Sequence, residues 1–133
     1  MTIRIIALIM ASMAVFCATA LEVSPGSLGW SLAGERDITE LVISGSIDAR
    51  DIAFMADSLP SLRRLDMSDV AVEAFTAVGR PLFANEVDYP ANVIPPMAFA
   101  NCGIAEVVLP QGVTAIGEGA FAGCTALSAF RKG

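Results

Sequence analysis

The chain has 133 residues, a hydrophobic fraction of 55% and a formal net charge of −6 at pH 7. This length suits one domain, and the acidic balance disfavours nucleic acid and anionic membrane surfaces as partners, because like charges repel. The sequence contains no histidine, which excludes Ser-His-Asp and Cys-His catalysis and imidazole metal sites.

Residues 1–20 have the layout of a secretory signal peptide. Arg4 precedes an apolar run from Ile5 to Phe16, and an Ala-x-Ala motif ends at Ala20. The run is shorter than the roughly 18 residues of a membrane span. We expect cleavage after Ala20, export, and no membrane span in the mature chain, which keeps 7 basic and 14 acidic residues. An uncleaved N-terminal anchor is the alternative.

Residues 21–37 are predicted to cap the first end of the fold. A turn at Pro25-Gly26 separates a short strand-like piece from a short helical turn. Leu28 and Trp30 are expected to pack over the end of the core, since repeat folds need such a cover. The alternative for Trp30 is an exposed binding position.

Three segments begin with the same spacing, apolar-x-x-apolar-x-apolar. They start at Ile38, Leu62 and Ile104, and each has the alternation of a half-buried strand. Between the first two, apolar residues share one helical face, which predicts a helix. No such unit can bury its apolar edge alone, so we expect the units to stack.

One short phrase occurs twice, first as MAFANC and then as GAFAGC. Phe99 recurs as Phe121 and Cys102 as Cys124, each after an offset of 22 residues. A period of roughly 20–29 residues is typical of leucine-rich repeats. The two phenylalanines are therefore predicted to occupy the same core position in neighbouring repeats and to stack on each other.

Residues 71–96 form a stretch longer than the repeat period allows, which predicts an inserted loop. It contains three aromatic residues, Phe75, Phe83 and Tyr89. Long loops in compact domains are often functional, so these three are candidate binding residues. In the alternative interpretation, Phe75 and Phe83 pack back on the flank of the repeats.

The uncovered face of the sheet is the other candidate binding surface. Eight side chains are predicted to point to it or to flank it: Glu40, Val42, Ser44, Arg64, Asp66, Ser68, Glu106 and Val108. Three rungs offer a small surface, which we expect to suit weak binding rather than to reach the roughly 1,000 Å² of a stable protein interface. The acidic residues are interpreted as solvated positions or helix caps, and no catalytic residue, metal site or cofactor is assigned.

Cys102 and Cys124 are predicted to lie in adjacent rungs. Stacked rungs can bring two Cα atoms within the roughly 4.4–6.8 Å that a disulfide requires, and an oxidising compartment favours the bond. Two free thiols that act as small hydrophobic residues are the favoured alternative.

The segment VIPPMAFANCGIAEVVLPQGVTAIGEGAFAGCTAL resembles the BspA-like leucine-rich repeats of bacterial cell-surface proteins. The resemblance implies a right-handed α/β solenoid, in which helical and irregular return segments join the strands of a short parallel β-sheet. It also implies an extracytoplasmic protein, secreted or at the surface of a bacterium, that mediates protein binding or adhesion without catalysis. The expected partner is a protein or glycoprotein of a host or neighbouring cell.

Residues 38–133 are accordingly predicted to be a leucine-rich repeat domain of about three rungs with a truncated C-terminus. Lys132 falls where Leu109 stood one rung earlier, and no cap follows. One alternative function is a truncated structural stub or spacer of a larger surface protein, with no ligand of its own. Another, weighed lowest, is an envelope hydrolase, which would need two acids about 5–10 Å apart across a groove. The ligand and the oligomeric state are not indicated.

Overall fold

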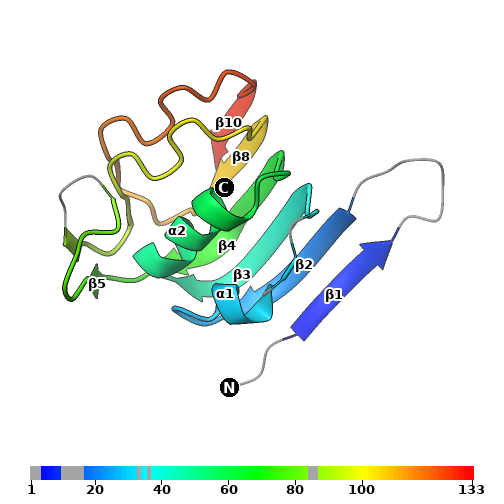
Figure 1. Cartoon of the computed structure of the whole chain (residues 1–133), viewed down its shortest axis with the longest axis horizontal. Coiled ribbons are helices and arrows are strands. Elements are labelled where there is room, and N and C mark those ends of the chain that lie inside the picture. Colours follow the sequence, from blue (N-terminus) through cyan, green and yellow to red (C-terminus); the bar gives the residue numbers. More distant parts are fainter. Residues whose placement is uncertain (1–3, 10–16, 33, 36, 84–86) are drawn as a thin grey trace.

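The computed structural model describes residues 4–9, 17–32, 34, 35, 37–83 and 87–133 (Figure 1). A six-stranded sheet in the order β1-β2-β3-β4-β8-β10 forms one layer, and the helices and return segments pack against it (Figure 1). The strands of this sheet are β1 (Arg4–Ile9), β2 (Cys17–Val23), β3 (Glu40–Ile47), β4 (Arg64–Val72), β8 (Glu106–Leu109) and β10 (Ala129–Lys132). The remaining elements are α1 (Leu28–Ser31), α2 (Ala49–Ser58), and two short pairs, β5 (Phe75–Thr76) with β6 (Asp88–Tyr89) and β7 (Val93–Ile94) with β9 (Ala115–Ile116).

Within the six-stranded sheet, the strands β2, β3, β4, β8 and β10 run parallel, because each return segment carries the chain back to the same end of the sheet. Leu41, Leu65, Val107 and Phe130 stand in one row across the four strands from β3 to β10. The first three of these side chains are at most 1% exposed. The short parallel strands fit the repeat fold that the spacing predicts.

The segment predicted to be a signal peptide takes part in the sheet. β1 pairs antiparallel with β2, and the first half of β2, up to Ala20, pairs with β3 at Glu40 to Val42. Leu21 to Val23 continue that pairing beyond the expected cleavage point. Cleavage after Ala20 stays a prediction. Among the described residues, we found no helix with the length and apolarity that a membrane crossing requires.

The start of α2 ties the N-terminal segment to the repeats. The Asp51 carboxylate accepts hydrogen bonds from the backbone N–H groups of Gly26 (2.7 Å), Leu28 (3.0 Å) and Asp48 (3.0 Å). Asp48 in turn caps α2 and pairs with Arg50 at 2.6 Å. One buried carboxylate therefore fixes α1 against α2.

The prediction that Trp30 packs over the core is wrong, because its side chain is 85% exposed. Leu28 and Leu32, one helical turn apart, take the inward positions and are buried. Two residues after Leu28, Trp30 falls on the opposite side of the short helix and points to solvent.

The inserted loop packs on itself through its aromatic residues. The Tyr89 hydroxyl accepts hydrogen bonds from the backbone N–H groups of Leu82 and Phe83, both at 2.9 Å. The rings of Phe83 and Tyr89 meet edge to face, with their centroids 6.0 Å apart. Phe83 and Tyr89 are buried, and half-buried Phe75 lies under the Arg50 guanidinium, 4.5 Å from the ring centroid. Phe75 and Phe83 thus pack back on the molecule, as the alternative interpretation held.

The chain has two return arms, residues 97–102 and residues 119–124. They follow the same path, one above the other. Met97, Phe99 and Asn101 donate backbone hydrogen bonds to the carbonyls of residues 118, 120 and 122, at 2.7–3.0 Å. Gly123 has φ +74°, and a Cβ there would collide with the side chain of Asn101 in the arm below. A glycine is thus required where the second arm crosses the first.

Candidate binding surface

A charged row crosses the uncovered face of the sheet. Arg64 lies on β4 between Glu40 and Glu106, which are its direct neighbours on β3 and β8. Its guanidinium contacts Glu40 Oε1 at 2.8 Å through Nη1 and Glu106 Oε2 at 2.7 Å through Nε. All three side chains are partly exposed. The structure thus brings together three of the predicted surface residues as one solvent-facing acid–base–acid row.

A second row on the same face contains Val42, Asp66, Val108 and Arg131 in register. Asp66 Oδ1 accepts hydrogen bonds from the backbone N–H (3.0 Å) and the hydroxyl (2.7 Å) of Ser68. Burial raises the pKa of Asp66. The two hydrogen bonds from Ser68 and the positive charges of Arg64 and Arg131 together lower it by more, so the net pKa lies below its ordinary value. The carboxylate is therefore ionised at neutral pH.

Val108 offers little contact surface, because it is 6% exposed between Asp66 and Arg131 in this row. Its place on the face agrees with the prediction, but its burial does not suit a side chain that touches a partner.

Ser44 and Ser68, both predicted surface residues, do not stand side by side. The register between β3 and β4 shifts between Val42 and Ser44, so that Ser44 pairs with Asp69. Both serines are half-buried, whereas Asp69 is exposed. The sequence interpretation missed Asp69 and Arg131. Arg131 follows Val108 by the repeat offset of 23 residues, and this offset would have predicted that it lies on the same face of the sheet.

The loop candidates Phe75, Phe83 and Tyr89 do not form an exposed aromatic patch. The large apolar side chains that the described part of the loop exposes are Val78 at 96%, Val87 at 39% and Leu82 at 37%. In this arrangement the aromatic residues shape the loop from inside, and smaller apolar residues reach solvent.

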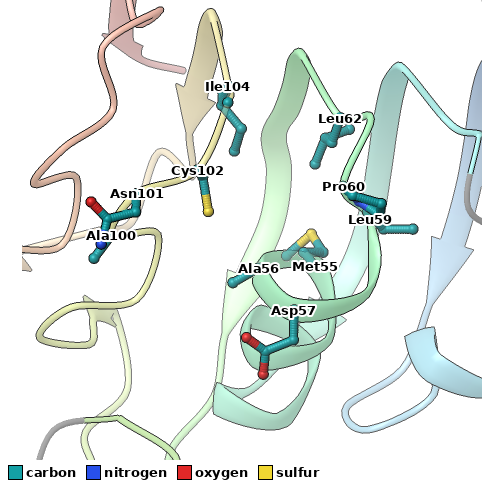
Figure 2. A pocket seen from close by; sticks show the side chains of 11 residues that line it. Met55, Ala56, Asp57, Leu59, Pro60, Leu62, Ala100, Asn101, Cys102 and Ile104 are labelled. Carbon is teal, nitrogen blue, oxygen red and sulfur yellow. The ribbon is translucent and has the colours of Figure 1, made fainter.

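A groove of about 260 Å³ lies between the C-terminal half of α2 and residues 100–104 (Figure 2). Figure 2 shows the Cys102 side chain pointing into the space between this return segment and α2. Burial, and then the neighbouring Cys124 and Asp57, raise the pKa of the Cys102 thiol to about 11. The thiol is thus protonated at neutral pH and is a poor nucleophile and metal ligand.

Cys102 and Cys124 are both free thiols in this structure. The Cys124 thiol donates a hydrogen bond to the Phe99 carbonyl at 3.0 Å, which holds it beneath the preceding return arm. Within the described ranges, no group of three or more acidic or cysteine residues is placed to hold a metal ion.

The parallel sheet, the row of core residues and the two superposed return arms define a protein built from repeats. Residues 86–131 match a family described as the BspA type leucine rich repeat region (6 copies), which confirms the resemblance over this segment. Repeats of this kind suggest a protein-binding surface protein and are generally not catalytic. No curated protein gave a match to the chain.

Proposed function

We propose that the chain is a secreted or cell-surface leucine-rich repeat solenoid that binds a partner and catalyses no reaction. The partner would be a protein or glycoprotein of a host or neighbouring cell. The observation that supports this most directly is the solvent-facing row Glu40–Arg64–Glu106, on a sheet whose other face is filled by the core. Charged residues on an open face favour a recognition surface over a packing surface.

The proposed organisation is a signal peptide at residues 1–20, a cap at residues 21–37 and a solenoid at residues 38–133 with an inserted loop at 71–96. The leader layout of the first twenty residues supports export. The hydrogen bonds between return arms support a stack in which each rung contacts its neighbours.

The proposed surface selects partners with positive charge. It exposes the acids Glu106 and Asp69, and it includes the partly exposed Glu40 and Asp66 against the cations Arg64 and Arg131. Arg64 is already shared by two carboxylates, so its charge is largely compensated. A partner with lysine or arginine on its contact surface would complement the excess acid and associate faster at low salt.

The test is a binding screen of the purified chain against an array of extracellular proteins and glycoproteins. For each hit, Asp69→Lys and Glu106→Lys are expected to weaken binding, whereas Glu118→Lys, a charge reversal at an exposed position outside the sheet, should leave it unaltered. Hits that respond equally to all three variants would contradict recognition by the sheet face. Export is tested separately by the intact mass of the protein from its source cells. A mass that corresponds to a chain beginning at Met1 would contradict signal cleavage.

The packed loop favours a second candidate, a structural spacer with no ligand of its own. Phe83 and Tyr89 are committed to internal contacts and are not available to a partner. For the envelope hydrolase, the groove of Figure 2 has a single acidic residue, Asp57, in its lining. A carboxylate pair is the minimum for that chemistry, so this groove does not support it.

A further inference from the structure

A small apolar hollow lies between the inserted loop and the start of the next repeat. Its volume is about 230 Å³, and its described lining consists of apolar side chains, the backbone of Gly117 and one carboxylate, that of Asp88. The apolar side chains that reach its surface belong to Pro90, Val93, Pro95 and Pro96. Sites for drug-sized ligands measure roughly 300–1,000 Å³, so this hollow suits a single side chain.

The walls of the hollow are held in place by the backbone. Proline rings restrict the chain at three lining positions. β7 pairs with β9 of the next repeat, and the Gly117 N–H donates to the Ile94 carbonyl at 2.7 Å. A Cβ at Gly117 would collide with the backbone of Pro95 and Pro96, so this close approach requires a glycine. The hollow is therefore preformed, which lowers the entropy cost of binding.

The carboxylate at the hollow has a fixed position and no cationic partner. Asp88 stands opposite Thr76 in the β5–β6 pair, and the Thr76 hydroxyl donates to Asp88 Oδ1 at 3.0 Å. The side chain of Asp88 is exposed. Within the described ranges, no lysine or arginine lines the hollow or forms an ion pair with Asp88. An apolar surface thus ends at a negative charge that the chain itself does not compensate.

From this combination, we propose that the hollow binds an arginine side chain of a partner protein. The methylene groups would lie along the proline rings, and the guanidinium would meet the Asp88 carboxylate. Arginine suits both parts, because its stem is apolar and its head is planar and more weakly hydrated than an ammonium group. The hollow is not built from the six-stranded sheet, so the proposal does not depend on recognition by the sheet face.

The probes are capped tripeptides with arginine, citrulline or lysine between two glycines, titrated into the isotope-labelled chain and followed by NMR. The arginine peptide is expected to shift the amide signals of Asp88, Val93 and Gly117 in a saturable manner. Citrulline has nearly the same shape without the charge, and its peptide should bind about threefold to fivefold more weakly, because an exposed ion pair contributes modestly. The lysine peptide should also bind more weakly than the arginine peptide.

A matched pair of variants tests the role of the carboxylate. Asp88→Asn keeps an acceptor for the Thr76 hydroxyl and should remove the preference for arginine over citrulline. Asp57→Asn makes the same charge change at an exposed position on α2 and should retain the preference. The spectrum of each free variant shows whether its fold is intact.

Four results would overturn the proposal. They are the absence of saturable shifts, shifts confined to the strands of the six-stranded sheet, equal binding of citrulline or lysine, and an undiminished preference for arginine in a folded Asp88→Asn variant.

Discussion

Phe99 and Phe121 stack with their ring centroids 5.4 Å apart and their planes 11° from parallel. Beside them, the Phe99 N–H donates to the Ala120 carbonyl at 2.7 Å. Phe130 then meets Phe121 edge to face at 5.2 Å. Phe99 and Phe121 thus form a column of two stacked rings from neighbouring return arms, and half-exposed Phe130, which lies on β10, contacts the second ring.

The column predicts unequal costs for the same truncation. Phe99→Ala should lower the free energy of unfolding by about 3–5 kcal/mol, because the ring is fully buried and its loss leaves a cavity. Phe121→Ala should cost less, because that ring is already partly exposed. Urea denaturation of both variants measures the difference. Equal decreases in the free energy of unfolding would contradict the expectation that the more buried ring contributes more.

Asp51 predicts a strong effect from a single carboxylate. Asp51→Ala leaves the N–H groups of Gly26, Leu28 and Asp48 without their acceptor, and one such buried loss costs about 1–3 kcal/mol. Asp57→Ala, at an exposed position on the same helix, is the matched control. Thermal denaturation should show a large drop in Tm for the first variant alone. Similar Tm values for the two variants would rule out Asp51 as the tie between α1 and α2.

The lowered pKa of Asp66 predicts an acid-dependent contribution to stability. Because the folded-state pKa lies below the unfolded value of about 3.9, the contribution is present at higher pH and is lost as the pH falls through the folded-state pKa. Asp66→Asn should therefore be less stable than the native chain at pH 7 and approach it at low pH. Denaturation curves of both proteins across this range provide the measurement, and a gap that widens on acidification would contradict the sign.

Cys102 is expected to react slowly with alkylating reagents at neutral pH. Burial is the main reason that its pKa is raised to about 11, so the thiolate fraction should rise about tenfold per pH unit below that value. Mass spectrometry of iodoacetamide-treated protein at several pH values measures the rate. Rapid labelling at pH 7, or a mass two daltons below that of the free thiols, would show an activated thiol or a disulfide with Cys124.

Trp30 is the single tryptophan, so intrinsic tryptophan fluorescence reports on it alone. With 85% of its side chain exposed, its emission should already resemble that of tryptophan in water and change little on unfolding. Iodide should quench it efficiently. A marked red shift on unfolding would instead place the ring inside the protein.

The repeat pattern predicted the parts of the fold that depend on stacking. The row from Leu41 to Phe130 and the Phe99–Phe121 stack were recognisable because equivalent core positions recur at a nearly fixed interval. The N-terminal cap of α2 could also be predicted, since Asp48 precedes a run of residues with one apolar helical face.

Other features depend on geometry that spacing does not encode. The inward position of Leu28 decides that Trp30 faces solvent, and a helix of four residues is too short for the sequence periodicity to show which side faces the core. The register shift after Val42 brings Asp69 into line with Ser44, and alternation of apolar and polar residues does not reveal such a shift. Burial of Val108 depends on its neighbours in adjacent strands. These are local backbone and packing effects, which a pattern of apolar residues does not determine.

The matched return arms also affect how this chain can change over evolutionary time. Three N–H groups of the first arm donate to carbonyls 21 residues later, so a gene duplication of one whole repeat would extend the hydrogen-bond ladder and the Phe99–Phe121 stack in phase. Insertion of a single residue inside an arm would move its phenylalanine out of the column. Viable length variants should therefore differ by whole repeats.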